Sequence, residues 1–486
     1  MIFIIRLFPE ITIKSVSVRK RWSKKLEANL RILARRIDET ASVVLDWDRL
    51  VLKTRGSDDN AEALISMLAS TPGIATFSQV HAYSYENMHD IYELAFKHWQ
   101  GRLEGKTFCV RVKRSGKQDF TSIELERYVG GGLNQNTPSK GVKLKNPDET
   151  VLIEVKDDTC YIVERRLPGL GGFPLGTQED VLSLVSGGFD STVASYLFMR
   201  RGLKTHFCFF NLGGREHEVA VKEVAFYLWN TFGSSHRVKF ISVPFEDVVA
   251  EILEKISPSN MGVVLKRMML RAAEQVLERG KFSAMVTGEA ISQVSSQTLP
   301  NLNAIDQVTD KLVLRPLIAM DKPEIIDIAR SIGTEELLAN IPEYCGVISV
   351  KPSANVNMSR LLGEENEFDM RLLDTAVSEA QVTLIDEVMN DIAPHAQTVE
   401  FVGEPEAGDV VVDVRHPAEV ERLPLNLPES VCLAIPFYQL KTRWPALDAN
   451  TRYLLYCDKG VMSHLHAQHL LDDGIKNIAV YRPSKA

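Results

Sequence analysis

The sequence predicts a multidomain protein of mixed α/β and α+β class, with a parallel sheet between helices in its central part. Its 486 residues exceed what one ordinary core organises, so we expect roughly three domains or more. From residue 181 onward, short apolar runs alternate with helical stretches, which is typical of a parallel sheet flanked by helices. Before it, residues 165–180 (RRLPGLGGFPLGTQED) hold prolines and glycines that cannot continue a helix or a central strand, and they predict a domain boundary.

The first 85 residues carry the elements of a small α+β domain. Residues 1–8 predict a strand, residues 19–37 a basic amphipathic helix, and residues 42–53 one or two strands. A helix over residues 59–73, ended by Pro-Gly, and a strand over residues 76–85 follow. Strand–helix–strand–strand–helix–strand is the order of the ferredoxin-like fold.

A segment rich in lysine and arginine follows this domain. Residues 89–103 predict a helix, and residues 106–120 predict a strand on which apolar residues alternate with basic or small ones. Residues 128–155 add a run of glycines that we expect to be flexible, more lysines and a return strand. Backbone freedom beside positive charge suits a surface that follows phosphates.

Two α/β regions make up the rest of the chain. Strands at residues 205–212, 238–245 and 284–290 alternate with helices up to about residue 385. Residues 388–409 read as a connector, and the last eighty or so residues again alternate short strands and helices.

Charge is unevenly distributed along the chain. Residues 1–37 hold ten lysines and arginines against two acids, and residues 102–145 hold ten against four, while the whole chain carries a formal charge of −8. Such a split predicts an anionic partner for the N-terminal part, of which nucleic acid is the commonest, with a pair of solvated basic faces as the alternative.

Composition excludes a membrane protein, since no apolar stretch approaches the roughly 20 residues that a helical span needs. The apolar opening is cut short by Pro9 and Glu10 and lacks a basic leader, so it predicts a strand and a cytoplasmic protein. Six scattered cysteines without a C-x-x-C pair indicate neither a disulfide framework nor a standard zinc site.

The strongest local signal is VLSLVSGGFDSTVASYLFMRRG, residues 181–202: a buried-type strand, a glycine turn and a helix that begins with hydroxylic and acidic residues. Its backbone N–H groups and serine hydroxyls predict a phosphate cradle, where Asp190 could help to hold Mg²⁺. Neither the Walker phosphate loop nor the dinucleotide G-x-G-x-x-G fits this spacing, and a plain Gly-Gly turn is the alternative. The pattern S-G-G-x-D-S is that of the PP-loop of ATP pyrophosphatases.

A second signal is Cys457, which stands where an apolar run ends and a helix-like segment, KGVMSHLHAQHL, begins. Backbone N–H groups and the positive end of a helix dipole favour a thiolate at such a turn. The alternative is a small residue that fills the turn.

The PP-loop, the basic N-terminal half and the cysteine turn together resemble the tRNA 4-thiouridine synthetase family, whose members also supply sulfur for the thiamine thiazole. The resemblance implies a ferredoxin-like domain over residues 1–60, extending to about 85, and a THUMP RNA-binding domain over 61–166. It further implies a PP-loop ATP pyrophosphatase domain over 177–385 and a rhodanese-like domain over 404–486. We expect THUMP residues to bind tRNA, namely Arg111, Lys113, Arg114, Lys117, Lys140 and Lys143.

The same resemblance implies which residues bind ATP. The family usually has Leu-Gly where this chain has Ile291-Ser292, which puts a close backbone approach there in question. The expected ATP-binding residues are Leu184, Val185, Ser186, Gly187, Gly188, Asp190, Ser191, Lys266, Gly288 and Gln297.

The residues expected to be catalytic are Asp190, Lys322, Cys345 and Cys457. The resemblance implies that Lys322 neutralises charge on the transferring phosphate and that Cys457 carries a persulfide beside Lys459. Cys345 is expected to form a redox-active disulfide with Cys457 when sulfur is released. Asp413 and Arg415 are expected to be structural.

The implied reaction adenylates the C4 oxygen of uridine 8 in tRNA with Mg-ATP and then transfers sulfur to C4. A cysteine desulfurase would load Cys457, and a thiamine-pathway sulfur carrier is a further expected partner. Attack by the persulfide itself and attack by released sulfide both remain open. Two other functions remain: a persulfide relay for thiamine synthesis, and an RNA-binding protein with a degenerate enzyme core.

Overall fold

The computed structural model describes residues 1–46, 49–56, 58–212, 214–339, 341, 352–390, 399–415, 420–421, 423–425, 427, 432–436, 440–457, 461–472 and 474–483. The chain divides into two compact units, Met1–Pro174 and Leu175–Ala486. We describe each unit separately.

The first unit is built on a mixed sheet with strand order β2-β3-β1-β4-β8-β7-β5-β6. Strand β1 pairs antiparallel with both β3 and β4, and helices α2 and α3 bury apolar side chains such as Leu26 and Leu64 against Phe3 and Phe77. The predicted ferredoxin-like order is confirmed. Its elements are β1 (Ile2–Leu7), α1 (Pro9–Thr12), α2 (Val16–Ile37), β2 (Ser42–Asp46), β3 (Arg49–Lys53), η1 (Asp58–Asn60), α3 (Ala61–Ser70) and β4 (Ile74–Ser84).

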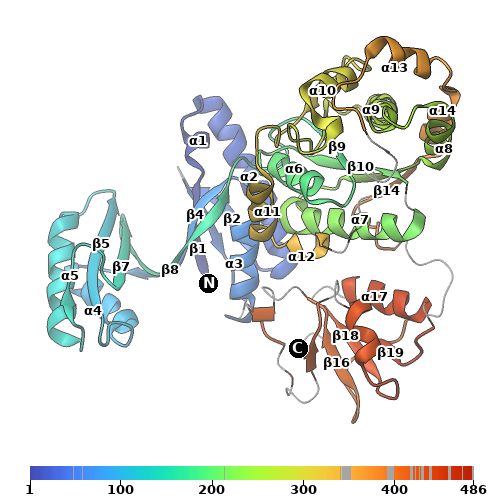
Figure 1. Ribbon diagram of the computed structural model, residues 1–486. Coiled ribbons are helices and arrows are strands. Elements are labelled where there is room, and N and C mark those ends of the chain that lie inside the picture. Colours follow the sequence, from blue (N-terminus) through green and yellow to red (C-terminus); the bar gives the residue numbers. More distant parts are fainter. Residues whose placement is uncertain are drawn as a thin grey trace. The chain divides into compact units, whose positions relative to one another are not determined.

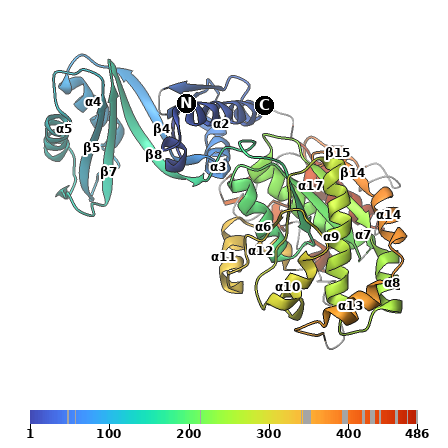
Figure 2. The same cartoon turned by 90° about the horizontal axis from the view of Figure 1, so that it is seen from above.

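The rest of this unit continues the same sheet. Strands β4 and β8 form a long antiparallel ribbon that both parts of the sheet share, which Figure 2 shows clearly. Helices α4 and α5 cover a separate apolar core with β5 and β7, which run parallel to each other. The elements are α4 (Met88–Trp99), β5 (Thr107–Ser115), α5 (Ser122–Asn136), β6 (Gly141–Val142), β7 (Glu149–Lys156) and β8 (Thr159–Gly171).

The prediction of flexible glycines at residues 130–132 is wrong, because these residues lie inside helix α5. A capping box formed by Thr121 and Glu124 starts this helix. A Cβ atom at Gly132 would lie 2.4 Å from the ring of Tyr92 on α4, so glycine lets the two helices approach closely.

The break expected over residues 165–180 also begins too early, since β8 continues through Pro168 to Gly171. Its pairing with β4 shifts register between Ile74 and Thr76, and Pro168 stands opposite Thr76 at this irregularity. A proline without an N–H is tolerated in a sheet at such a bulge.

In the second unit, a sheet with order β13-β12-β9-β10-β11-β14 lies between helices (Figure 1). Its neighbours are parallel except for the edge strand β14, which runs antiparallel to β11. The strands and short 3-10 or π turns here are β9 (Val181–Val185), β10 (Thr205–Asn211), η2 (Trp229–Gly233), β11 (Lys239–Pro244), β12 (Ala284–Val286), η3 (Ser295–Gln297), β13 (Val313–Leu314) and β14 (Gln381–Leu384). The helices are α6 (Phe189–Arg200), α7 (Gly214–Leu228), α8 (Glu246–Lys255), α9 (Met261–Gly280), α10 (Leu299–Asp306), α11 (Lys322–Ser331), α12 (Glu335–Leu338), α13 (Met358–Glu365) and α14 (Arg371–Ser378).

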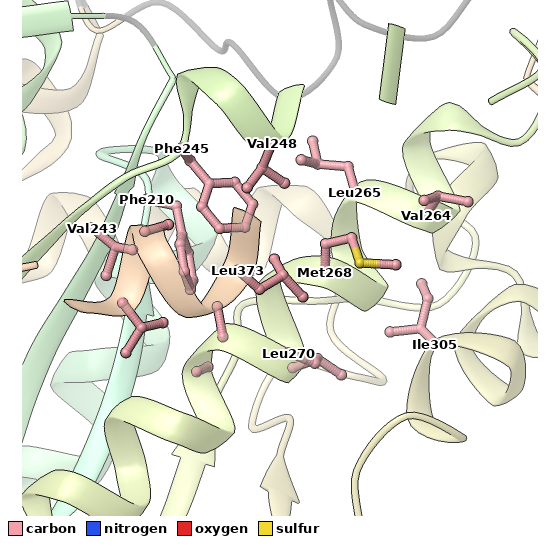
Figure 3. Close-up of a cluster of buried hydrophobic side chains, with 14 of the residues drawn as sticks. Phe210, Val243, Phe245, Val248, Val264, Leu265, Met268, Leu270, Ile305 and Leu373 are labelled. Atoms are coloured by element: carbon pink, nitrogen blue, oxygen red, sulfur yellow. The ribbon is translucent and has the colours of Figure 1, made fainter. Parts of the chain in front are cut away.

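Helix α9 is central to the packing of this sheet. Figure 3 shows Leu265, Met268 and Leu270 of α9 in the cluster that also holds Phe210 and Phe245. Several of these side chains back directly onto the cavity described below, so the core fixes the wall of the site.

A further parallel sheet, with order β15-β19-β18-β16-β17, holds the C-terminal elements. Among the described residues of the chain, no helix combines the length and the apolarity needed to cross a bilayer. The elements are β15 (Phe401–Val402), β16 (Val410–Asp413), β17 (Cys432–Ala434), α16 (Leu440–Arg443), η6 (Trp444–Ala446), β18 (Tyr453–Tyr456), α17 (Val461–Asp472) and β19 (Ile478–Tyr481).

Candidate nucleotide and sulfur sites

The loop between β9 and α6 forms a tight turn at the carboxyl end of a central parallel strand. Gly187 has a φ of +80°, a left-handed conformation that favours glycine, and a Cβ there would lie 3.0 Å from Ile341 and Val221 side-chain atoms. Gly188 is the N-cap of α6 and provides no side-chain cap, so the first turn of the helix has orphan N–H groups available to an anion.

Hydroxyl groups brace this loop from inside. The Ser186 N–H donates to Ser191 Oγ at 3.2 Å, and the Thr192 hydroxyl donates to the Gly188 carbonyl at 2.9 Å. His217 of α7 lies 2.9 Å from the Ser186 carbonyl through Nε2. Burial lowers the pKa of His217, which favours a neutral ring that donates to this carbonyl.

A cavity of about 540 Å³ opens beside the loop. Its wall is polar at the loop and apolar toward Phe209, Met269 and Ile305. Every residue expected to bind ATP lines it except Gly187. Gly288 lies so close to α6 that a Cβ there would be 2.5 Å from the carbonyl carbon of Asp190.

At the start of α6, the carboxylate of Asp190 has cationic and amide partners. Lys322 Nζ, at the first residue of α11, donates to its two oxygens at 2.9 and 3.1 Å. Gln293 donates to Oδ2 at 2.7 Å. The structure therefore brings together two residues that are 132 positions apart in the sequence and were both expected to be catalytic.

Lys266 also lines the cavity, where it meets a buried carboxylate. Its ammonium lies 2.8 Å from Glu289, and Arg315 Nε lies 2.7 Å from the other oxygen of the same group. Burial would raise the pKa of Glu289, but the charges and hydrogen bonds of Lys266 and Arg315 outweigh it and hold the pKa at about 2. The carboxylate of Asp306 accepts hydrogen bonds from Nη1 and Nη2 of Arg315.

Ser292 occupies the position where the family usually has glycine, and its φ is +62°. Hydrogen bonds from the Ser292 N–H to the Gln297 carbonyl and from the Gln293 N–H to the Ala290 carbonyl hold this turn. The backbone thus keeps the left-handed conformation without the glycine, at a cost in strain.

The second candidate site is the turn after β18. Cys457 is 9% exposed, and its sulfur accepts a hydrogen bond from the Ser463 N–H of α17 at 3.3 Å and lies 3.4 Å from the Ser463 hydroxyl. Asp413 and Arg415 form a buried ion pair at 2.6 Å, and the Arg415 guanidinium lies over the ring of Tyr456, next to Cys457 in the chain. Cys345 and Lys459 lie outside the described residues.

The cations expected to bind RNA follow one strand and a nearby loop. Arg111 and Lys113 are exposed and alternate along β5 with the buried Phe108 and Val110. Lys117, Lys140 and Lys143 are also exposed. Arg114 is half-buried and bonds to both the carbonyl and the side chain of Gln118, so it is the least available of the six.

Similarity to known proteins decides the family. A tRNA sulfurtransferase from Saccharophagus degradans is 61% identical over 484 residues, which cover 99% of this chain and 100% of that protein. The chain belongs to the tRNA sulfurtransferase family. Another tRNA sulfurtransferase, from Shewanella pealeana, is 52% identical over 99% of this chain and 100% of its own length.

Family models match this chain in four consecutive stretches. They are a ThiI ferredoxin-like domain at residues 2–78, a THUMP domain at 85–163, a thiamine biosynthesis protein (ThiI) at 176–370 and a rhodanese-like domain at 398–484. The solved complex of a 4-thiouridine synthetase with RNA and bound ATP has a TM-score of 0.69 at 25% identity, and the match covers 79% of this chain and 99% of that one.

Sequence reasoning missed four polar residues at the candidate nucleotide site: His217, Glu289, Gln293 and Arg315. Glu289 and Gln293 lie within the same segment, TGEAISQ, as the expected ATP-binding residue Gly288. This segment is therefore the part of the sequence that could have indicated both residues. His217 and Arg315 have no motif around them, and their partners become visible only when the sheet brings separate loops together.

Proposed function

We propose that this chain converts uridine 8 of tRNA into 4-thiouridine, using ATP to activate the base and a persulfide on Cys457 as the sulfur source. One observation carries the proposal. A glycine turn at a helix N-terminus and the Lys322–Asp190 pair lie at a cavity large enough for a nucleotide. In the last domain of the same chain, a cysteine stands between the end of a strand and the start of a helix.

ATP would lie with its phosphates against the Gly187–Gly188 turn and the hydroxyl of Ser191. Its adenine would enter the apolar part of the cavity next to Leu184 and Val185. The bound ATP of the 4-thiouridine synthetase complex with the same fold supports this assignment. Lys266, Gly288 and Gln297 complete the expected contacts.

In the activation step, the C4 oxygen of the uracil attacks the α-phosphorus of ATP. The bond between the α-phosphorus and its bridging oxygen breaks, pyrophosphate leaves, and AMP remains on the base. Lys322 neutralises charge on the phosphate in this step. A single carboxylate beside phosphates is a fitting Mg²⁺ ligand, so Asp190 is the residue that would hold the ion, which would supply further neutralisation.

In the sulfur step, the terminal sulfur of the Cys457 persulfide attacks C4 and AMP leaves with the original oxygen. The Cys345 thiolate then attacks the Cys457 sulfur, which releases 4-thiouridine and leaves a Cys345–Cys457 disulfide for an external dithiol to reduce. The other order, in which Cys345 first liberates sulfide and the sulfide attacks C4, gives the same products.

The exposed cations Arg111, Lys113, Lys117, Lys140 and Lys143, with a smaller contribution from Arg114, would bind the phosphates of the tRNA. Affinity should therefore fall steeply as salt concentration rises. We place the protein in the cytoplasm, where thiols remain reduced and a cysteine desulfurase can load Cys457. Delivery to a thiamine-pathway sulfur carrier is a second use of the same persulfide, supported by the ThiI family match.

The test is a reconstitution with unmodified tRNA, Mg-ATP, cysteine and a cysteine desulfurase, read by the absorbance of thiouridine. We expect thiolation that disappears in Asp190→Ala and in Cys457→Ser. Persulfide transfer to a carrier without tRNA thiolation would replace the proposal with a relay. Binding of tRNA with neither reaction would leave an RNA-binding protein.

A further inference from the structure

We propose that Arg315 is a positioning residue that keeps Glu289 ionised when Lys266 turns from this carboxylate to a phosphate of the nucleotide. The inference rests on the proposed binding of ATP in the cavity. It assigns a role to Arg315, which lies beside the nucleotide site but is not among the residues expected to bind ATP.

The geometry gives Glu289 two cations from different elements. Lys266 reaches it from α9, and Arg315 reaches it from the segment after β13, at 2.8 and 2.7 Å. The Thr287 hydroxyl adds a hydrogen bond at 3.1 Å. Because Glu289 is only 7% exposed, solvent offers little replacement for a partner that leaves.

The two cations differ in how firmly they are held. Arg315 is tied on its other side by two hydrogen bonds to Asp306, and its planar guanidinium is fixed between the two carboxylates. Lys266 has a flexible stem, lines the cavity and has Glu289 as its ion-pair partner. The lysine can therefore swing toward a phosphate, whereas the arginine stays on Glu289.

Other titratable groups along the cavity already have partners. Lys322 is paired with Asp190, and His217 lies on the Ser186 carbonyl, so neither of these side chains pairs with Glu289 in place of Lys266. Without Arg315, departure of Lys266 would leave a buried carboxylate alone, and it would take up a proton from solvent. With Arg315 present, the carboxylate stays ionised and the cation moves without proton transfer.

The test measures proton uptake on ATP binding by calorimetry in buffers of different ionisation enthalpy. In wild type we expect little uptake beyond that of ATP itself. In Arg315→Gln, one additional proton should be taken up per ATP, and the dissociation constant for ATP should rise with pH by up to about tenfold per unit relative to wild type. Arg330→Gln, which removes an exposed arginine paired with Glu335, is the matched control and should behave as wild type.

The double variant Arg315→Gln/Lys266→Met separates this mechanism from a general disturbance. With no lysine to move, ATP binding should no longer change the surroundings of Glu289, and the extra proton uptake should vanish. If Arg315→Gln fails to fold, Arg315→Met, which keeps an unbranched stem without the charge, should show the same extra uptake. Arg315→Lys, which keeps a cation, and Glu289→Gln, which removes the titrating group, should show none.

The inference is overturned if Arg315→Gln binds ATP with the proton count and pH dependence of wild type, or if the extra uptake persists in the double variant. Failure of the proposed function looks different, because wild-type protein itself would then not bind ATP. Circular dichroism of each variant establishes that the compared proteins are folded.

Discussion

The Gly187–Gly188 turn and the Cys457 turn use the same local architecture for opposite purposes. Each follows a parallel strand, β9 or β18, and each leads into a helix whose N-terminus favours negative charge. At the first turn, glycines remove side chains so that an anion can enter from outside. At the second, the reacting group of the proposed function is the sulfur of Cys457, which belongs to the chain itself. We propose that the first turn is a receptor for the charge of the nucleotide and the second a carrier of sulfur.

Their surroundings differ accordingly. The nucleotide turn is ringed by paired charges, Lys322 with Asp190 and Lys266 with Glu289, which can rearrange around a ligand. The sulfur of Cys457 is held by the N–H and hydroxyl of Ser463. A site that admits a highly charged ligand needs mobile counter-charges, whereas a thiol needs fixed dipoles that leave its sulfur reactive.

The largest effect should come from Cys457→Ser. Because no other group on the chain is expected to carry the transferable sulfur, thiolation should fall by on the order of 10³-fold or more, while ATP affinity stays unchanged. Absorbance of the modified tRNA and ATP calorimetry measure the two quantities. Cys432→Ser, a half-buried thiol in the same sheet, is the control. An equal loss in both variants would mean that the Cys457 turn has no special role.

Gly288→Ala should damage the receptor turn. Its Cβ would press on the backbone of Asp190 and Ser191 at 2.5 and 2.6 Å, so helix α6 must shift. We expect a loss of up to about 3 kcal/mol in unfolding free energy and weak ATP binding. Gly363→Ala, whose Cβ meets nothing within 4 Å inside helix α13, should be neutral or slightly stabilising. Urea denaturation and calorimetry compare the two, and equal stabilities would contradict the close approach.

Glu289 should make stability depend on pH at the receptor turn. Its folded pKa of about 2 is below the ordinary 4.5, so its contribution is complete above pH 4.5 and is lost as pH falls toward 2. The shift corresponds to at most about 3 kcal/mol. Urea denaturation over this range should show the difference between wild type and Glu289→Gln shrinking with acid. A difference that stays constant with pH would contradict the paired state of Glu289.

The smallest effect is expected for Ser292→Gly. Glycine relieves the left-handed strain at this residue but adds freedom to the unfolded chain, so the net gain should stay under about 1 kcal/mol. Thermal unfolding measures it. Thiolation and ATP affinity should not change, since the turn that orients Gln293 already forms. A marked rise in activity would show that the serine impairs the site.

The sequence was sufficient for the order of elements and for the SGGFDS turn, since both depend on local pattern and on residues close together in the chain. It misjudged the glycines of α5 and the course of β8, because Gly132 is explained by Tyr92 on another helix and Pro168 by a bulge against β4. Arg315 was missed for the same physical reason. Its importance comes from Glu289 and Asp306, which the fold gathers from elsewhere.

The β4–β8 ribbon has a consequence for dissecting the first unit. Residues 74–84 pair with residues 159–171, so the stretch between them is inserted within a hydrogen-bonded ladder and not appended after it. A chain cut near residue 85 would leave β4 as a bare edge, open to association with other strands. The order of the elements along the sequence therefore does not show where this unit can be truncated. Fragments should be designed to keep both strands together.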